Sequence, residues 1–502
     1  MPATFTYQFD TPSFKGTTTI NTGLFIDGDF VNPVENGTID VINPTNGKVI
    51  TTVAAGSPKD IDIAVAAAKK AYKAVWGLKT PGFERGKLLN KLADLLEANI
   101  EELAALESLN TGKTFTMSRT MDLPTAIAML RYYAGWADKV QGKTLETTDQ
   151  KFAYSRREPY GVVGQIIPWN FPLMILSWKI AATLATGNVV VLKPSEVTPL
   201  TALRVASLIK EAGFPPGVVN IVNGYGPTAG QAISEHLGVA KISFTGSMIV
   251  GRKVLKASAE SNLKDVTLEL GGKSPTVIFD DADLEQAIKW AAHGIFFNMG
   301  QACTAGSRIF VQEGIYDEFL QRFKGVAEFI DNATGDPFAA ETQHGPQVSE
   351  TQFNRVMGYI NSGNEDGAKL LVGGERHGED GFFIQPTIFT DVKKDMKIVT
   401  EEIFGPVGVV IKFKTEEEAI EAANDTIYGL AAHIFTQNLN RAIRVAHAVE
   451  AGSLFVNCSN APDVTVPFGG YKQSGIGRDL GEYALDTYTQ VKGVHINIGQ
   501  KL

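Results

Sequence analysis

The stretch VVGQIIPWNFPLMILSWKIAATLATGNVVVLKPSE, residues 162–196, decides the fold. It contains a β-rich run at 162–167, a helical stretch after it, and a second β-rich run at 189–192. A strand, a helix and another strand in this order are typical of a parallel sheet with helices packed on it. We therefore predict an α/β fold, and the sequence on either side shows how far this pattern extends.

The pattern continues toward the C-terminus in two series. The first has β-rich runs at 218–222, 241–244 and 266–270, separated by helical stretches of about 10–15 residues. The second starts after Lys273 and continues to Phe455. Its first strands and helices are expected at 275–279, 283–298, 309–311 and 316–329. Two series predict two α/β lobes rather than one continuous sheet.

The two ends of the chain have different patterns. A capping box at Ser57-Pro58-Lys59-Asp60 predicts the start of a helix. The tail at 487–498 alternates like an exposed edge strand, which commonly pairs with a partner chain. Short strands are expected at 24–26, 41–42 and 49–53, and helices at 83–108 and 122–140.

Composition excludes several classes of protein. The 502 residues are 44% hydrophobic and 20% charged, as in an ordinary globular protein, and their net charge is −9 without a basic run. We therefore expect no nucleic-acid or membrane partner. Two cysteines and seven scattered histidines predict neither a disulfide framework nor a metal site. Residues 1–16 resemble neither a secretory signal nor a mitochondrial presequence, so the expected compartment is the cytoplasm.

Two glycine-rich turns are candidate nucleotide-binding segments. The first, GYGPTAG at 224–230, has the spacing GxGxxxG, one residue longer than the dinucleotide fingerprint. The second, FTGSMIVG at 244–251, also runs from a strand into a helix, where backbone N–H groups and the hydroxyl of Ser247 could hold a pyrophosphate. For either turn alone, a tight bend that requires glycine is the favoured explanation. Two of them on consecutive strand–helix units favour a nucleotide site.

The segment KPSE at 193–196 follows the strand at 189–192, at the sheet edge where open α/β folds bind ligands. Lys193 and Glu196 could hydrogen-bond ribose hydroxyls, and the carboxylate would repel a 2′-phosphate. This arrangement favours NAD over NADP. An incidental ion pair in a solvated turn is the alternative.

Three further residues are candidates for chemistry. Cys303 lies among small residues in NMGQACTAG at 298–306, and its use as a nucleophile needs a nearby base, cation or helix N-terminus because a free thiol is mostly protonated at neutral pH. Glu269 interrupts an apolar strand, and burial would raise its pKa into the range of a general base. Asn170 could donate to an oxyanion or cap the next helix. The alternatives are a buried structural thiol, as we expect for Cys458, and a solvated carboxylate.

Seven segments taken in order resemble the motifs of the NAD(P)-dependent aldehyde dehydrogenase superfamily. They are PWNFP at 168–172, KPSE at 193–196, FTGS at 244–247, LELGGKSP at 268–275, GQACTAGSR at 300–308, EEIFGPV at 401–407 and PFGGYK at 467–472. The resemblance covers nearly the whole chain and is greatest to the tetrameric cytosolic and mitochondrial enzymes of eukaryotes, with a fungal character.

The resemblance implies a fold with a Rossmann-like cofactor-binding domain, an α/β catalytic domain and a small β arm that joins subunits. It implies a homotetramer, a dimer of dimers, acting on a small aldehyde. The corresponding ranges are 1–140 with 160–271 for the NAD-binding domain, 272–473 for the catalytic domain, and 141–159 with 474–502 for the oligomerisation arm.

The resemblance also assigns roles. Cys303 matches the nucleophile that forms a thiohemiacetal, Asn170 the amide that holds its oxyanion, and Glu269 the base that activates water to hydrolyse the thioester. Residues matched to the NAD site are Ile166, Pro168, Trp169, Lys193, Ser195, Glu196, Gly226, Phe244, Gly246, Ser247, Val250, Gly271, Gln352, Glu402 and Phe404. The expected substrate tunnel is formed by Met121, Phe171, Met174, Trp178, Phe297 and Phe468.

Two departures from the family pattern and three alternative functions stay open. Ala302 and Thr304 flank Cys303 where close relatives often have cysteines, and residues 459–463 lack the aromatic side chain often found in the tunnel. A coenzyme-A-acylating dehydrogenase would not need Glu269 as a base, and a non-catalytic relative would be expected to have lost Cys303 or Glu269. The third alternative is efficient use of NADP. The prediction is an NAD-dependent enzyme that oxidises aliphatic or aromatic aldehydes to acids.

Overall fold

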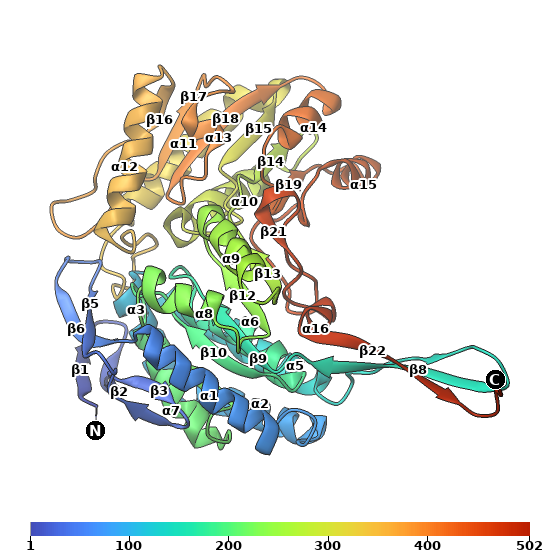
Figure 1. Ribbon diagram of the computed structural model, residues 1–502. Helices are drawn as coiled ribbons and strands as arrows, with labels where there is room; N and C mark the ends of the chain where they lie inside the picture. The colour runs from blue at the N-terminus through green and yellow to red at the C-terminus, as the bar shows by residue number, and fades with distance from the viewer. Residues whose placement is uncertain (1) are drawn as a thin grey trace.

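Two separate sheets with helices packed on them make up the body of the protein, and a third, small sheet projects from it as an arm (Figure 1). The computed structural model describes residues 2–502. In these residues the first sheet has eight strands in the order β21-β13-β12-β9-β10-β11-β3-β4, and the second has seven in the order β16-β17-β18-β15-β14-β19-β20. The predicted division into two α/β sheets is therefore confirmed.

The first sheet combines a parallel centre with antiparallel edges. Its strands are β3 (Leu24–Ile26), β4 (Asp29–Val31), β9 (Val162–Ile166), β10 (Val189–Lys193), β11 (Val219–Ile221), β12 (Lys241–Thr245), β13 (Asp265–Glu269) and β21 (Gly475–Ile476). All five residues of β10 are buried, because a parallel strand with helices on both faces has no solvent side. The register brings Lys193, Ile166 and Phe244 together at one carboxyl edge.

Helices surround this sheet. They are α1 (Pro58–Ala74), α2 (Gly82–Ala98), α3 (Ile100–Thr111), α4 (Phe115–Met117), η1 (Ser118–Asp122), α5 (Leu123–Trp136), α6 (Pro172–Ala185), α7 (Leu200–Ala212), η2 (Gly226–Gly230), α8 (Gln231–Glu235) and α9 (Met248–Glu260). The capping box predicted for α1 is present, with the Ser57 backbone N–H donating to Asp60 Oδ2 at 2.8 Å.

The helix predicted at 83–108 is two helices, α2 and α3, separated at Asn99. The Asn99 side-chain amide donates to the Leu95 carbonyl at 2.8 Å and so satisfies an end carbonyl of α2. Asparagine side chains compete with the backbone for such bonds, which is why they favour helix ends. The helix predicted at 122–140 begins one residue later, after the π-helical turn η1, and ends at Trp136.

The second sheet carries its own helices and cores. Its strands are β14 (Pro275–Ile278), β15 (Arg308–Gln312), β16 (Lys369–Val372), β17 (Thr387–Thr390), β18 (Val407–Phe413), β19 (Ala431–Phe435) and β20 (Ser453–Val456). The helices after β13 are α10 (Leu284–Phe296), η3 (Phe297–Gly300), η4 (Glu313–Ile315), α11 (Tyr316–Asn332), α12 (Glu350–Glu365), α13 (Lys397–Thr400), α14 (Glu416–Asn424), α15 (Leu439–Ala448), η5 (Lys472–Ser474) and α16 (Tyr483–Thr487). The two sheets belong to separate apolar clusters: one contains residues of the first sheet, and two others contain residues of the second.

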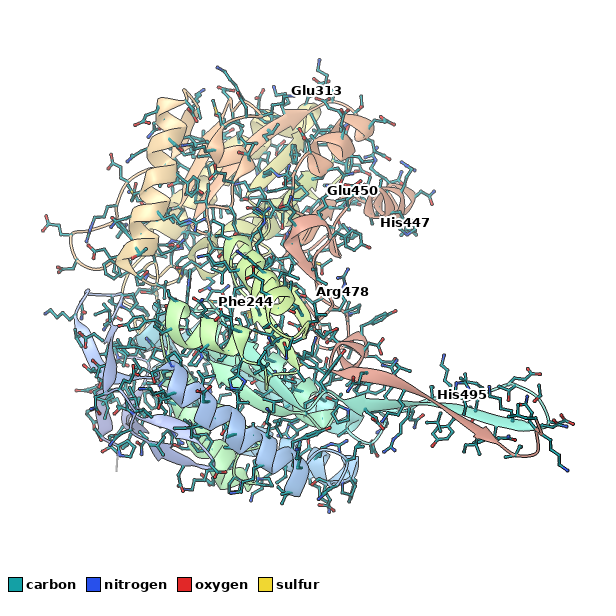
Figure 2. The ribbon with its side chains drawn as sticks, in the orientation of Figure 1. Phe244, Glu313, His447, Glu450, Arg478 and His495 are labelled. Carbon is teal, nitrogen blue, oxygen red and sulfur yellow. The ribbon has the colours of Figure 1, made fainter. Side chains whose placement is uncertain are left out.

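The arm is formed by β7 (Thr144–Leu145), β8 (Lys151–Pro159) and β22 (Thr489–Asn497), with β8 at its centre. Figure 2 shows His495 far out on this arm, whereas Phe244 and Arg478 lie near the middle of the molecule. The segment 474–502, predicted as arm, divides in the structure because β21 pairs with β13 of the first sheet. Two hairpins complete the fold: β1 (Thr4–Asp10) with β2 (Lys15–Asn21), and β5 (Gly37–Ile42) with β6 (Val49–Ala55). From residue 2 onward, the structure contains no helix with the length and apolar character that a membrane crossing requires.

Candidate active site

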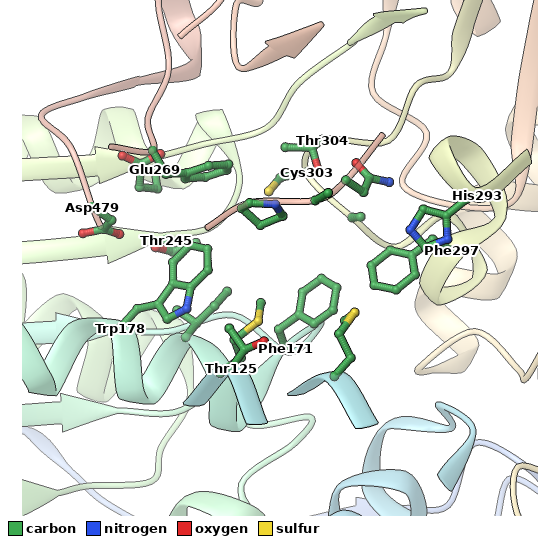
Figure 3. A pocket seen from close by; sticks show the side chains of 18 of the residues that line it. Thr125, Phe171, Trp178, Thr245, Glu269, His293, Phe297, Cys303, Thr304 and Asp479 are labelled. Atoms are coloured by element: carbon green, nitrogen blue, oxygen red, sulfur yellow. The ribbon is translucent and has the colours of Figure 1, made fainter. Parts of the chain in front are cut away.

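A cavity of about 570 Å³ brings Cys303 and Glu269 onto one wall (Figure 3). Glu269 ends β13 of the first sheet, and Cys303 lies in the loop between η3 and β15 of the second. All six side chains predicted for the tunnel line this cavity: Met121, Phe171, Met174, Trp178, Phe297 and Phe468. The cavity is therefore mainly apolar, with a thiol and a carboxyl group among its few polar groups.

The loop that carries Cys303 has an unusual backbone. Asn298, Met299 and Gly300 have φ values of 49°, 55° and 71°, so the chain turns sharply after α10. A Cβ atom at Gly300 would lie 2.0 Å from the Gly405 carbonyl oxygen, so only glycine fits there. The Gln301 N–H donates to the Asn298 carbonyl at 2.9 Å and closes the turn.

The Cys303 thiol is protonated in this environment. Burial raises its pKa to about 12, and the nearby carboxyl groups of Glu402 and Glu269 add to the shift. The sequence analysis required a base, a cation or a helix N-terminus near the thiol. Glu269 is a candidate base, and no cationic side chain among residues 2–502 lowers the pKa of the thiol. Nucleophilic use of this thiol therefore requires that a base take its proton.

Glu269 has the properties of such a base. It is 4% exposed, and neither carboxyl oxygen has a hydrogen-bond partner among residues 2–502. Burial raises its pKa well above the usual range, Asp479 adds to the shift, and Lys179 and Arg478 oppose it. The rise predicted from the sequence thus has the expected direction and the expected main cause. A carboxyl group without fixed donors can exchange a proton with a molecule in the cavity.

Asn170 contacts the nucleophile loop. The Asn170 side-chain amide donates to the backbone carbonyl of Gln301 at 3.0 Å. The backbone carbonyl of Asn170 accepts from the Asn298 side-chain amide at 3.1 Å. It does not cap the next helix, because Phe171 occupies the N-cap position of α6. The side chain lies beside the loop of Cys303 and is not among the residues that line the cavity. The amide nitrogen has a second N–H, for which the structure gives no hydrogen-bond acceptor among residues 2–502.

The sequence analysis did not identify an ion pair at the cavity, Lys179–Asp479. The Lys179 Nζ lies 2.6 Å from Asp479 Oδ2, both side chains are almost completely buried, and Asp479 lines the cavity. The available signal was Lys179 itself, the single charged residue in the apolar sequence of α6. Its partner could not be found from sequence because it is 300 positions away.

The edge of the first sheet carries the candidates for nucleotide binding. The Lys193 Nζ lies 2.9 Å from Glu196 Oε2, and Glu196 Oε1 accepts from the Gly226 N–H at 3.4 Å. Burial favours the neutral form of Glu196, but the charge of Lys193 and the backbone donors outweigh it, so its pKa is lowered and it is ionised. The two predicted segments at 193–196 and 224–230 therefore meet.

The second glycine turn lies at the start of α9, a helix of 13 residues. Ser247 is its N-cap residue and makes no side-chain cap bond, so its hydroxyl and the first N–H groups of α9 are available to a ligand. Val250 in the first turn is 41% exposed. The Gly246 N–H donates to the Glu269 carbonyl at 3.0 Å and ties this turn to β13.

The remaining candidates come from the second lobe. Glu402 Oε1 accepts from the Gly272 N–H at 3.0 Å, and burial raises the pKa of Glu402 to about 7. A Cβ atom at Gly271 would lie 2.1 Å from Glu402 Oε2. The Phe404 ring packs edge-on against Trp169 at 5.2 Å between centroids, and the Gln352 side chain donates to the Phe404 carbonyl at 2.7 Å.

These groups fit a dinucleotide in three respects. A free helix N-terminus suits a pyrophosphate, a carboxylate held by a lysine suits a ribose diol, and a second carboxyl group with an aromatic neighbour suits the other ribose and its base. Of the other predicted positions, Ile166 and Phe244 are neighbours in the sheet, Pro168 follows β9, and the Ser195 hydroxyl accepts from the Val197 N–H at 3.3 Å.

Comparisons with known proteins agree on one family. Residues 30–494 match the family model described as "Aldehyde dehydrogenase family". The chain is 62% identical to an aldehyde dehydrogenase of Agaricus bisporus over the full length of both proteins. It is 53% identical to the mitochondrial aldehyde dehydrogenase of Homo sapiens, covering 95% of this chain and 92% of that protein. A structure described as the NAD⁺ complex of aldehyde dehydrogenase from Bacillus cereus matches with a TM-score of 0.93 and 48% identity, covering 95% of this chain and 96% of that one.

Proposed function

This chain belongs to the aldehyde dehydrogenase family, and from that premise we propose that it oxidises aldehydes to carboxylic acids with NAD through a covalent intermediate on Cys303. The observation that carries this proposal is the apolar cavity in which the thiol shares a wall with the unpaired carboxyl group of Glu269. The overall reaction consumes an aldehyde, NAD and water, and it yields a carboxylic acid, NADH and a proton.

The first step adds the Cys303 sulfur to the aldehyde carbonyl carbon. Because the thiol is protonated, Glu269 takes its proton as the C–S bond forms. The negative charge then moves to the carbonyl oxygen, where the free N–H of the Asn170 amide and the backbone N–H of Cys303 donate to it. Donors of this kind each contribute about 2.7–4 kcal/mol to the lowering of such barriers.

When bound, NAD would supply the acceptor for the hydride that leaves the thiohemiacetal. The Cys303 sulfur then carries the acyl group as a thioester. Glu269 releases the thiol proton to solvent, and it can then take a proton from water. The hydroxide adds to the thioester carbonyl, the C–S bond breaks, and the departing sulfur takes the proton back from Glu269, which releases the acid and the thiol. Because no group among residues 2–502 hydrogen-bonds to the Glu269 carboxyl, its oxygens are free for these proton transfers.

In this proposal, Lys193 and Glu196 bind one ribose, Ser247 and the N-terminus of α9 bind the pyrophosphate, and Glu402 binds the other ribose. The ionised Glu196 favours NAD over NADP because it would repel a 2′-phosphate. The supporting positions are Ile166, Pro168, Trp169, Ser195, Gly226, Phe244, Gly246, Val250, Gly271, Gln352 and Phe404. The tunnel residues admit the aliphatic or aromatic part of the aldehyde.

We also propose that the protein works as a homotetramer in the cytoplasm. The arm supports association because its antiparallel strands leave apolar side chains exposed, among them Phe152, Val491 and Ile496. Two free thiols suit a reducing compartment. Light scattering of the purified protein measures the assembly, and fractionation of cells measures the compartment.

Purified protein mixed with NAD and acetaldehyde tests the central proposal through the absorbance of NADH. The wild-type protein should form NADH steadily, Cys303→Ala should form none above background, and Cys458→Ala, the matched control at the other thiol, should keep the wild-type rate. A wild-type protein that forms no NADH contradicts the function. A Cys303→Ala variant with the full rate contradicts the assigned nucleophile.

A further inference from the structure

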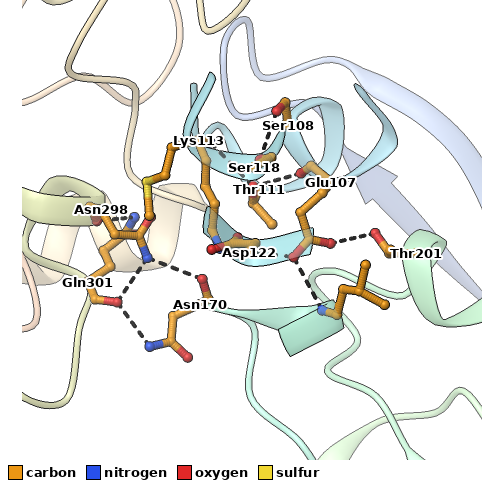
Figure 4. Close-up of polar contacts among 12 residues, drawn as sticks. Glu107, Ser108, Thr111, Lys113, Ser118, Asp122, Asn170, Thr201, Asn298 and Gln301 are labelled. Carbon is orange, nitrogen blue, oxygen red and sulfur yellow. Dashed lines mark hydrogen bonds and ion pairs between the residues drawn. The ribbon is translucent and has the colours of Figure 1, made fainter. Parts of the chain in front are cut away.

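Three charged side chains that the proposed mechanism does not use form a buried cluster next to the cavity wall (Figure 4). Glu107, Lys113 and Asp122 are at most 1% exposed. The Lys113 ammonium group donates to Asp122 Oδ2 and lies 3.9 Å from Glu107 Oε1. Buried charges of this kind are weak evidence for stability, because their desolvation often outweighs their attraction. The contacts of the cluster therefore decide what it does.

Local backbone features turn these residues inward. Gly112 ends α3 in the left-handed conformation, with φ of 80°, and Lys113 follows directly. Asp122 is the last residue of the π-helical turn η1, which also carries Met121 into the cavity. Single π-helical turns inside helices frequently occur at functional sites. The same turn thus joins the charge cluster to the tunnel wall.

The cluster holds the segment 170–173 at its C-terminal side. Glu107 Oε1 accepts from the Leu173 backbone N–H at 3.2 Å, and Glu107 Oε2 accepts from the Thr201 hydroxyl at 2.6 Å. The Lys113 ammonium lies 4.1 Å from the centroid of the Phe171 ring, within cation–π range. One face of the Phe171 ring is therefore fixed by a desolvated cation, while Phe171 itself lines the aldehyde cavity.

The loop of Cys303 holds the same segment at its N-terminal side. The Asn298 side-chain amide donates to the carbonyls of both Asn170 and Gln301 at 3.1 Å. The Asn170 amide in turn donates to the Gln301 carbonyl at 3.0 Å. Segment 170–173 is thus clamped between a buried cation and the turn that positions the nucleophile.

We propose that Lys113, held by Glu107 and Asp122, is a positioning residue that fixes segment 170–173, so that the Asn170 amide and the Phe171 ring meet the aldehyde at Cys303. This inference rests on the function proposed above. Without the cation, the Phe171 ring loses its contact and the segment gains freedom at the side opposite Cys303. A displacement of about 1 Å at a reacting centre can lower a rate about 100-fold.

The test compares Lys113→Met/Asp122→Asn with wild type and with Lys241→Met. The double variant removes one charge of each sign, so it does not leave Asp122 as a buried carboxylate without its cation. Glu107 loses the cation 3.9 Å away but keeps its donors at Leu173 and Thr201. Lys241 is an equally buried lysine that pairs with Asp265 at the opposite, amino-terminal ends of β12 and β13, which makes it a matched control. We expect the double variant to lose about 10- to 100-fold in kcat/KM for acetaldehyde. The control should keep the wild-type kcat/KM.

Two further readouts separate positioning from a general structural role. Alkylation of Cys303 by iodoacetamide, followed by mass spectrometry, needs no oxyanion donor and should proceed at the wild-type rate in the double variant. The dissociation constant of NAD should also be unchanged. A kcat/KM equal to wild type overturns the proposal, and so does an alkylation rate that falls by the same factor as kcat/KM.

Glu107 gives a second pair of variants in case the double variant does not fold. Glu107→Gln keeps an oxygen that can accept from the Leu173 N–H, and it should retain kcat/KM within about threefold. Glu107→Leu removes the acceptor and should lose about tenfold with Cys303 alkylation unchanged. Equal activity of these two variants overturns the proposal. A wild-type protein without aldehyde oxidation would contradict the proposed function itself, whereas active wild type with fully active variants contradicts only this inference.

Discussion

Two carboxyl groups, Glu269 and Glu402, act on the Cys303 thiol, and their surroundings differ. Both raise the pKa of Cys303, and burial raises the pKa of both. Glu402 accepts a backbone N–H from Gly272 and lies against Gly271, where no side chain would fit. Glu269 lines the large apolar cavity without a hydrogen-bond donor among residues 2–502. A carboxyl group fixed by the backbone is suited to bind, whereas one without fixed partners is suited to transfer protons.

Of the two substitutions Glu269→Gln and Glu402→Gln, the first should lower kcat more. A general base typically contributes about 10²–10⁴-fold, so we expect steady-state kcat to fall by about that factor. Because Glu269 also takes the thiol proton before hydride transfer, rapid mixing should show that the burst of NADH slows together with the steady state. A burst at the wild-type rate would mean that Glu269 acts only in hydrolysis of the thioester.

The same comparison predicts a pH dependence. A base acts only when it is deprotonated, so kcat should rise with pH through the pKa of Glu269, which burial places well above the usual range of a carboxyl group. The profile measured between pH 5 and pH 9 should lose this rising limb in Glu269→Gln and keep it in Glu402→Gln. A rising limb that disappears in Glu402→Gln instead would reverse the assignment of the two groups.

Glu402→Gln should change binding more than chemistry. The amide oxygen can still accept from the Gly272 N–H, but it is a weaker acceptor for ribose hydroxyls than a carboxylate. We expect the KM for NAD to rise about tenfold, with the KM for acetaldehyde unchanged and kcat reduced far less than in Glu269→Gln. Initial rates over a matrix of NAD and aldehyde concentrations measure this. A loss of kcat as large as that of Glu269→Gln would remove the distinction between the two groups.

Local sequence predicted the parts of this site that lie within single strand–turn–helix units. The strands that end at Lys193, Thr245 and Glu269 were predicted to end at 192, 244 and 270, each within one residue, because apolar runs and glycine turns are local signals. The high pKa of Glu269 followed from a carboxyl group in an apolar strand. The roles assigned to Cys303 and Asn170 came from resemblance to a family, since a thiol among small residues indicates no reaction by itself.

Contacts between distant positions could not be predicted in this way. Asp479 meets Lys179 across 300 positions, and Glu107 meets Thr201 across 94, so neither pair leaves a periodic pattern. The break between α2 and α3 was missed because the apolar spacing continues past Asn99 while the side chain of Asn99 ends the helix. Hydrogen bonding also stays hidden in the sequence, which is why the backbone donor to Glu402, and the lack of a donor to Glu269 among residues 2–502, could not be predicted.

Glu196 is the third carboxylate of the site and provides the smallest expected effect, on the choice of cofactor. Burial raises the pKa of Glu269 and Glu402, whereas the pKa of Glu196 is lowered, because Lys193 at 2.9 Å and the Gly226 N–H offset the effect of burial. Glu196→Gln removes the charge that would repel a 2′-phosphate and keeps an oxygen for a ribose hydroxyl. We expect kcat/KM with NADP to rise about fivefold and kcat/KM with NAD to fall by about threefold or less, since a partly exposed charge contributes about 1 kcal/mol at such distances. Measuring kcat/KM with each cofactor at fixed ionic strength decides the point, and Ser195→Ala, which leaves the charge in place, is the matched control. If the ratio of kcat/KM with NADP to kcat/KM with NAD is unchanged in Glu196→Gln, the ionised carboxylate does not select between the two cofactors. The cofactor site would then discriminate by shape rather than by charge.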